Sequence, residues 1–400
     1  MNGTELDVEQ RAAEWDPHAP EAAADPPASW AALRERCPVA WSDRMSGFWA
    51  VSRFDDVVSI ARASERFNNS GGPQFGTSRP PLEVDRPEHT FFRRVLQPHF
   101  AKERVLGLEP AVRGFVAEML APVLAAGEGD LAEALTYPLP ARTLCLRLGL
   151  PDGEWAYLKG VSEELFAAEE GRGDDPATRA ACNEKLYDYS RRLVRERVEH
   201  PRDPEIDLIS GILGETDGVH AVTEESCVEL VRLLLTAGHN STTGGIGNSI
   251  LRIAREPEIQ RRLRDDPGLI PSAIEEFLRL ETPVQAMPRW PNEDVELHGR
   301  TMRAGEMVML VWASANRDPE RFPEPERCIL DRTPNEHVTF GRGIHRCIGI
   351  DLARLEIRVA VEELLARSEW FALAGEPVRT TFIRQGVSYL PVRFGRETAQ

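Results

Sequence analysis

The feature that most constrains this chain is a glycine-rich loop that carries one cysteine and runs directly into an apolar helix. The loop reads FGRGIHRCIG over residues 340–349, and the helix is predicted over 348–365. Gly341 and Gly343 allow tight turns with positive φ, which bring amide N–H groups close to the Cys347 sulfur. The dipole at the start of the helix is directed at the same atom, and both effects favour thiolate over thiol. A thiolate held beside an apolar surface is the environment that an axial haem ligand requires.

The loop resembles the haem-binding signature of the cytochrome P450 superfamily, F-G-x-G-x-H-x-C-x-G, and matches it at every fixed position. The resemblance implies that Cys347 is the iron ligand and that Phe340, His345 and Gly349 contact the haem. The alternative is a buried structural cysteine in a glycine-rich loop. Three further motifs, in the order that the family has them, favour the haem interpretation.

The first of these motifs is DRPEHTFFRR at residues 85–94. Pro87 and Glu88 suit the first turn of a helix, and His89 and Arg93 then share one helix face. Two donors at this spacing can hold a carboxylate. In the family such a His-x-x-x-Arg pair binds the haem propionates, which is the role implied here; the alternative is a solvated helix face.

The second motif lies in a long helix predicted over 224–256, with Thr223 as its N-cap and Pro257 after its end. Its middle reads LLLTAGHNSTTGG over 233–245. Such a run of Gly, Ser and Thr is expected to loosen or kink a buried helix and leave room for water or dioxygen. It resembles the family's oxygen-activating helix, which implies that Ala237 and Gly238 contact the haem. The alternative is a crossing of small residues without a catalytic role.

This helix departs from the family pattern A-G-x-[Asp/Glu]-Thr-Thr. Asn240 replaces the usual acid and Ser241 replaces the usual first threonine. Ser241 keeps a hydroxyl donor, whereas Asn240 orients water but cannot relay a proton by ionising. Proton delivery is then left to solvent, to His239 or to the substrate. Thr242 can replace Ser241 only if the helix rotates by about 100° or bulges there.

The last motifs supply structural residues and one more haem contact. The resemblance implies that Glu276 and Arg279 form the family's buried E-x-x-R pair, although helices also produce this spacing by chance. Arg289 occupies the position of the family's strand arginine, which pairs with a haem propionate. The segments at 315–319 and 322–327 resemble the meander that precedes the cysteine loop.

Apolar residues recur at three-to-four spacing through most of the chain, which predicts a mainly α protein with small peripheral β-sheets. We expect helices at 88–103, 108–126, 154–168, 177–200, 224–256, 267–280 and 348–365, and strands within 38–52, 294–312 and 376–394. The prism-shaped cytochrome P450 fold implied by the resemblance holds haem between the long central helix and the helix after the cysteine. We expect a flexible lead-in over residues 1–28 and a single haem-thiolate monooxygenase domain over 29–400.

Composition excludes several other classes of protein. The net charge of −17 disfavours binding to nucleic acid or to anionic membranes. No apolar run reaches about 18 residues, and the N-terminus lacks a basic start and an apolar core, so neither a membrane span nor a secretory signal is predicted. Six scattered cysteines without paired spacing fit a reducing compartment. We expect a cytoplasmic monomer.

The substrate pocket is less well defined by sequence than the haem site. By position in the family, the loop at 68–84 caps the pocket, and the segments at 284–287 and 382–386 face the substrate. The expected apolar wall comprises Phe75, Leu234, Val284, Met287, Phe382 and Ile383, with Gln285, Arg384 and Gln385 as polar groups. Apolar walls with a few polar groups describe most pockets, so the substrate remains a small organic molecule or a peptide-type compound.

The resemblance implies haem b and dioxygen as cofactors, with electrons from NAD(P)H delivered by a ferredoxin or flavodoxin and its reductase. The expected activity is hydroxylation or O- or N-dealkylation of a small organic substrate in secondary or aromatic metabolism. Oxidative coupling of a peptide or tailored metabolite is an alternative, motivated by Asn240 and Ser241. A haem sensor without turnover is a third. Arg94, Arg342 and Arg346 are expected to form a basic face for an acidic partner, or are ordinary solvated arginines.

Overall fold

The computed structural model describes residues 13–71, 78–170, 176–380 and 382–396. Its α-helices confirm the mainly α prediction. They are α1 Pro20–Ala24, α2 Pro26–Arg36, α3 Phe54–Arg62, α4 Glu88–Leu96, α5 Lys102–Leu106, α6 Glu109–Ala126, α7 Pro138–Arg147, α8 Glu154–Glu170, α9 Pro176–Glu199, α10 Leu208–Ile212, α11 Glu224–Arg255, α12 Pro257–Asp265, α13 Ile270–Leu280, α14 Trp312–Ala315 and α15 Ile350–Arg367.

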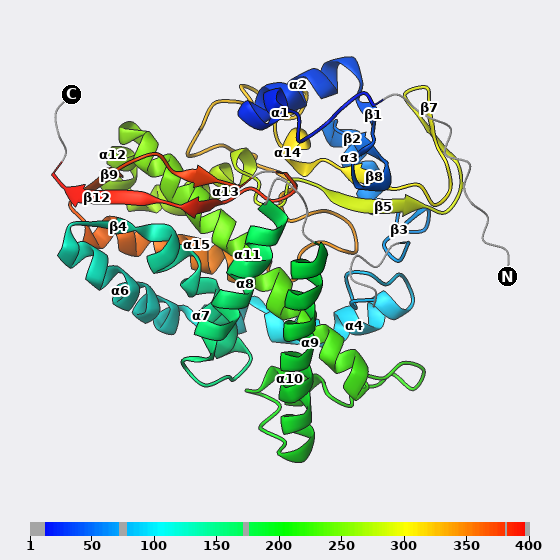
Figure 1. Cartoon of the computed structure of the whole chain (residues 1–400), viewed down its shortest axis with the longest axis horizontal. Helices are drawn as coiled ribbons and strands as arrows, with labels where there is room; N and C mark the ends of the chain where they lie inside the picture. The colour runs from blue at the N-terminus through cyan, green and yellow to red at the C-terminus, as the bar shows by residue number, and fades with distance from the viewer. Residues whose placement is uncertain (1–12, 72–77, 171–175, 381, 397–400) are drawn as a thin grey trace.

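The strands form small sheets at the periphery of the helical body (Figure 1). The largest has the order β1-β2-β8-β5-β3, with β2 and β8 parallel and the other neighbours antiparallel. A second sheet has the order β4-β12-β9, and two hairpins pair β6 with β7 and β10 with β11. The strands are β1 Val39–Ser42, β2 Phe48–Val51, β3 Phe67–Asn68, β4 Glu128–Asp130, β5 Met287–Pro291, β6 Val295–Leu297, β7 Arg300–Met302, β8 Val308–Leu310, β9 Trp370–Leu373, β10 Val378–Arg379, β11 Val387–Tyr389 and β12 Pro391–Gly395.

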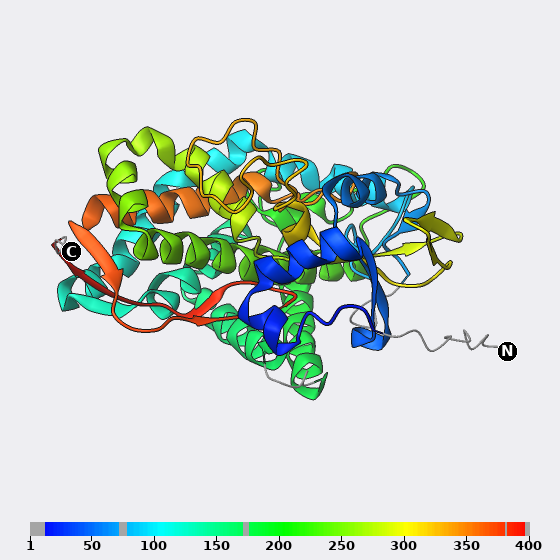
Figure 2. The same ribbon diagram turned by 90° about the horizontal axis from the view of Figure 1, so that it is seen from above.

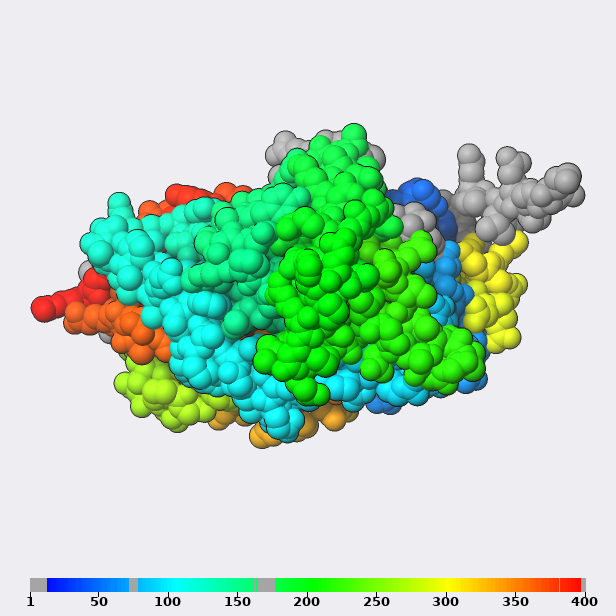
Figure 3. Space-filling view, turned by 90° about the horizontal axis from the view of Figure 1, so that it is seen from below, coloured from blue at the N-terminus to red at the C-terminus, as the bar shows by residue number. Residues whose placement is uncertain are grey.

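Helix α11 runs through the middle of the helical body, beside α15 (Figure 2). The Thr223 hydroxyl caps its start by accepting from the Ser226 N–H at 3.1 Å, as the sequence predicted. Most of its side chains are buried, because α7, α9 and α15 pack around it. Figure 3 shows the molecule from below, where the region of α9 and α10 covers much of the face opposite to the one in Figure 2. Among the helices that the structure describes, none is long and apolar enough to cross a membrane.

The flexible lead-in over residues 1–28 stays a prediction, but its described part, residues 13–28, contacts the rest of the molecule. Trp15 is buried, and its ring lies edge-on to Phe48 and Phe382 at centroid distances of 6.3 and 5.7 Å. Glu14 accepts from the Trp41 N–H at 3.0 Å, and α1 and α2 follow directly. The alanine- and proline-rich composition did not indicate these contacts, which depend on one buried indole and one carboxylate.

Candidate active site

The cysteine loop adopts the turns that its glycines predicted. Gly341 and Gly343 have φ of 70° and 75°. A Cβ at Gly343 would lie 2.2 Å from the carbonyl oxygen of Ala61, so only glycine fits there. The Cys347 N–H donates to the Phe340 carbonyl at 2.9 Å and closes the loop. Helix α15 begins three residues after the cysteine, at Ile350.

Cys347 has accessible surface as a residue, although its sulfur lies at depth among protein groups. Burial raises the pKa of its thiol, while the Gly349 N–H, which donates to the sulfur, and the neighbouring Arg93 and Arg346 lower it. In the polypeptide alone, burial therefore outweighs the effects that favour the thiolate, and the pKa of the thiol is raised. The predicted preference for thiolate over thiol is not found there. Coordination to a metal ion deprotonates such a thiol outright.

Four basic side chains from three separate parts of the chain gather near this loop. The rings of His89 in α4 and His345 in the loop lie 4.4 Å apart. Arg93, one turn after His89, donates to the Arg346 carbonyl at 2.5 Å. Arg289 in β5 lies close enough to His345 to lower its pKa. The structure thus brings together His89, Arg93, Arg289 and His345, which the resemblance assigned to the haem; their contact with haem stays a prediction.

Among the described residues, no hydrogen bond or ion pair joins any of these four groups to a carboxylate; Arg93 and Arg289 donate only to main-chain carbonyls. Neither ring nitrogen of His89 makes a well-placed hydrogen bond to the described residues, and Nε2 of His345 makes none. Burial, aided by neighbouring cations, lowers the pKa of His89 to about 4 and that of His345 to about 2. Burial also lowers the pKa of Arg289 to about 10. Donors that have no carboxylate partner suit an anionic ligand. The two propionates of a haem would meet this requirement beside the cysteine.

The middle of α11 differs from its predicted form. The helix is continuous from Glu224 to Arg255, without the loosening or kink expected around Gly238. Hydroxyl groups donate to carbonyls one turn back, as from Ser241 to Ala237 at 3.1 Å and from Thr243 to His239 at 3.2 Å. These bonds add to the helix ladder without opening it.

The residues of α11 that were expected to lie near dioxygen differ in their exposure. Ala237, Gly238 and Ser241 have accessible surface, in contrast to most of this buried helix. Asn240 is buried, and its Oδ1 has no hydrogen-bond partner among the described residues. Thr242 is 5% exposed, and because the helix neither rotates nor bulges, it does not replace Ser241.

His239 is not suited to the proton route that was left open for it. Its Nε2 lies 2.8 Å from the Tyr137 carbonyl, and the residue is 1% exposed. Burial lowers its pKa to about 4, so the ring is neutral at neutral pH and serves as a structural donor.

The two segments expected to face the substrate lie side by side. Val284 and Arg384 form an isolated antiparallel bridge, and the Gln285 N–H donates to the Ile383 carbonyl at 2.9 Å. Val284, Met287, Phe382 and Ile383 are partly exposed, whereas Leu234 is buried. Phe75 lies outside the described residues. The role of these side chains as a substrate wall stays a prediction.

The sequence analysis did not predict the role of Gly244 and Gly245, which allow other parts of the chain to pack closely against α11. A Cβ at Gly244 would lie 2.7 Å from the Gln385 carbonyl, and one at Gly245 would lie 2.8 Å from the Ile357 side chain in α15. Gly244 therefore lets the segment at 382–386 approach the helix three residues after Ser241. The Gly-Gly pair itself was the available signal.

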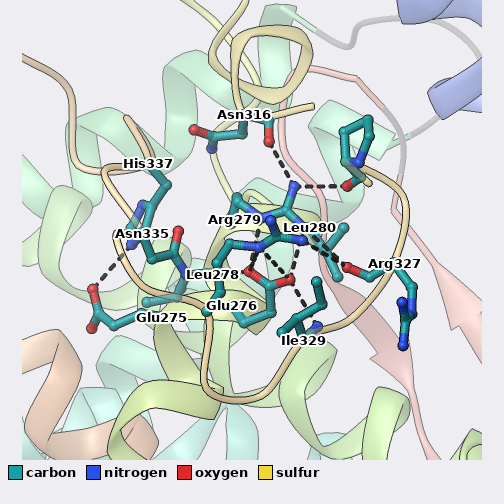
Figure 4. Close-up of polar contacts among 12 residues, drawn as sticks. Glu275, Glu276, Leu278, Arg279, Leu280, Asn316, Arg327, Ile329, Asn335 and His337 are labelled. Carbon is teal, nitrogen blue, oxygen red and sulfur yellow. Dashed lines mark hydrogen bonds and ion pairs between the residues drawn. The ribbon is translucent and has the colours of Figure 1, made fainter. Parts of the chain in front are cut away.

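Glu276 and Arg279 form a fully buried ion pair (Figure 4), each side chain 0% exposed. Both guanidinium contacts measure 2.8 Å. The remaining Arg279 donors reach the main-chain carbonyls of Asn316, Pro325 and Arg327, in the predicted meander. Glu276 also accepts from Arg332 and from the Ile329 N–H at 3.0 Å. The pair thus fixes the meander that precedes the cysteine loop.

Comparison with known proteins agrees with this geometry. A family model described as Cytochrome P450 matches residues 268–395. Mycinamicin IV hydroxylase/epoxidase of Micromonospora griseorubida is 35% identical over 333 residues, covering 80% of this chain and 81% of that protein. Cytochrome P450 monooxygenase PikC of Streptomyces venezuelae is 35% identical over 398 residues, 94% of each chain. The solved structure of HmtN, a post-tailoring hydroxylase involved in himastatin biosynthesis, matches with a TM-score of 0.83 at 31% identity, covering 92% of this chain and 96% of that one.

The fold and the cysteine site define a haem-thiolate oxygenase, and the extent of these similarities shows that the chain belongs to the cytochrome P450 family. It is accordingly an oxidoreductase that uses dioxygen.

Proposed function

We propose that this protein hydroxylates or dealkylates a small organic molecule of secondary metabolism, with electrons from a separate redox partner. The observation that carries the proposal is the meeting of Cys347 with four basic side chains, two of them buried, none of which pairs with a carboxylate among the described residues. The names of similar proteins support the metabolic setting, since one refers to mycinamicin IV and another to himastatin biosynthesis.

The haem, when bound, supplies the iron that activates dioxygen and oxidises the substrate. Cys347 would hold the iron, and His89, Arg93, Arg289 and His345 would hold the propionates. The Ser241 hydroxyl donates to the Ala237 carbonyl, and in this orientation its oxygen can accept a hydrogen bond from water. It can donate toward the dioxygen side only after the hydroxyl rotates. Asn240 holds water through its amide without ionising.

A spin-state titration tests the proposal and narrows the substrate. The purified ferric protein is titrated with small aromatic or terpenoid-like compounds and, separately, with aromatic-containing peptides. We expect saturable high-spin conversion by a small molecule and a product about 16 mass units heavier, or a dealkylated product. Conversion by peptides alone, with a product 2 mass units lighter, would instead support oxidative coupling. Ligand binding without substrate-dependent NAD(P)H consumption would support a sensor.

Ser241 and Asn240 are expected to control how much product forms per electron pair. A Ser241→Ala variant should lower product per NAD(P)H on the order of tenfold, because it removes the accessible hydroxyl. Asn240→Asp should raise product formation severalfold, since a buried carboxyl without a cationic partner takes up a proton and can donate it. Product and peroxide are quantified in the same reactions. Thr242→Ser is the control. Product per NAD(P)H that is unchanged in Ser241→Ala would contradict the role assigned to the Ser241 hydroxyl.

A basic surface near the cysteine loop supports an acidic electron donor such as a ferredoxin or flavodoxin. Burial, together with the charges of the nearby Arg346, Arg62 and Arg321, lowers the pKa of Arg342. These four arginines are concentrated on a protein whose net charge is −17. Arg94 in α4 is exposed and lies 3.4 Å from Asp217. Complementary charge of this kind accelerates encounter with an acidic partner.

Charge reversal at Arg346 and Arg94 is expected to slow reduction by such a donor about tenfold at low ionic strength. The difference should shrink as salt is added, because surface charges are screened. Stopped-flow reduction under carbon monoxide measures the rate. Arg396→Glu, at an 88% exposed side chain beyond the β4-β12-β9 sheet, is the control. Equal rates for all three proteins would show that these arginines do not bind the donor.

A further inference from the structure

A cavity of about 510 Å³ lies between the N-terminal helices and the C-terminal end of α11. None of the residues assigned above to haem or dioxygen lines it, whereas Phe382, Gln285 and Gln385, which were expected to face the substrate, do. Its lining comes from the segment at 15–30, from α11 after Asn248, and from residues around Glu281, Arg317 and Gln385. The volume is that of a site for one small organic molecule.

The cavity is lined both by aromatic rings and by charged side chains. Trp15, Trp30 and Phe382 supply large ring surfaces, next to small alanine and proline residues of α1 and α2. The charged members of the lining are four arginines and three glutamates, which are Arg252, Arg255, Arg317, Arg379, Glu256, Glu281 and Glu326. Arg317 lies over the Trp30 ring, 5.9 Å from its centroid. A lining that combines apolar rings with a few fixed charges suits a ligand with a flat apolar body and one polar end.

The charged groups of the lining have one more positive than negative charge. Glu281 accepts from Arg252, from Arg379 at 2.6 Å and from Gln385 at 2.9 Å, so its two oxygens are already engaged. Glu256 pairs with Arg252 at 2.5 Å, and Glu326 pairs with Arg317. Arg255 is exposed at the rim and has no ion-pair partner among the described residues. The unmatched charge is therefore a cation, which favours an anionic ligand.

Side chains of this cavity also hold the segment that approaches α11. Gln385 donates to Glu281 and accepts from Gln285 at 3.1 Å. The Gln385 carbonyl accepts from Asn248 at 3.1 Å and lies against Gly244. A molecule in the cavity would thus contact the same network that positions residues 382–386.

We propose that this cavity is a second binding site, separate from the haem side, for a small aryl carboxylate. The rings of Trp15 and Trp30 cover the aryl group, and Arg255 with its neighbouring arginines binds the carboxylate. Binding requires no turnover, so the proposal does not depend on the identity of the oxidised substrate.

Isothermal titration of the haem-loaded protein with 4-phenylbutyrate tests this site. We expect saturable binding at least about tenfold tighter than that of the neutral analogue 4-phenylbutyramide. Arg255→Gln should remove that preference, because it deletes the unpaired cation at the rim, whereas the exposed Arg262→Gln should keep it. Equal affinity for acid and amide would overturn the anionic assignment. No saturable binding below about 10 mM would overturn the site.

A pair of alanine variants locates the binding. Ala23→Trp places a ring in the cavity from an exposed position on α1, and Ala28→Trp adds the same ring on α2 away from the lining. Ala23→Trp should weaken 4-phenylbutyrate binding at least about tenfold, and Ala28→Trp should leave it unchanged. Both variants should keep the Soret spectrum of the parent. Binding retained in Ala23→Trp would show that the ligand lies elsewhere, including the haem side.

Discussion

A Cys347→Ser variant is expected to lose the red-shifted Soret band of its reduced carbon monoxide complex and at least about a hundredfold of its substrate-dependent turnover. The band reports a thiolate bound to haem iron, and serine provides neither the sulfur nor its electron donation. The loop itself should persist in the variant. Its main-chain bond from the residue 347 N–H to Phe340 and its positive-φ glycines do not involve the sulfur.

Haem content, the carbon monoxide spectrum and product formation are measured on the same preparations. Cys37→Ser is the matched control, because Cys37 lies on the sheet side of the molecule and donates to the Val39 carbonyl at 3.3 Å, a bond that serine can also make. A thiolate-type band in Cys347→Ser, or a histidine-type band in the parent protein, would refute the ligand assignment.

An Arg279→Met variant is expected to lower the free energy of unfolding by about 3–5 kcal/mol. It leaves the Glu276 carboxylate buried without its main partner and removes donors from the carbonyls of Asn316 and Pro325. Arg332 still reaches Glu276, which keeps the variant foldable while the meander loosens. Haem binding should weaken with it, since the meander leads into the cysteine loop.

Urea unfolding followed by far-UV circular dichroism measures this loss. Glu324→Gln is the control, because Glu324 and Arg327 form an ion pair with the same three-residue spacing, but both side chains are more than half exposed. Its removal should cost less than about 1 kcal/mol. Similar losses in the two variants would show that burial of the pair does not determine its contribution.

The same pair predicts an acid dependence. Hydrogen bonds and charge from Arg279 outweigh burial and lower the pKa of Glu276 below its ordinary value. A depressed carboxyl pKa stabilises the fold above the unfolded value of about 4.3, and that contribution is lost as the pH falls through the lower folded value. The stability difference between parent and Arg279→Met should therefore narrow in acid.

The sequence by itself determined the local features of this protein. The turns at Gly341 and Gly343, the Thr223 cap and most of the long helices depend on neighbours in the chain. The shape of the cysteine loop was predictable for the same reason, because its cysteine, glycines and helix start are contiguous. Short helices such as α3 and α12 were missed, since few residues carry their periodicity.

Only the tertiary structure decided which distant groups meet and which are buried. It placed His89 against His345 and joined Gln285 to Gln385. Among the described residues, it left both ring nitrogens of His89 and the Nε2 of His345 without a well-placed hydrogen-bond partner. It also packed the Trp15 ring against Phe48 of β2 and showed that burial raises the pKa of Cys347. Desolvation and pairing depend on packing between segments far apart in sequence, and local propensity contains no information about either.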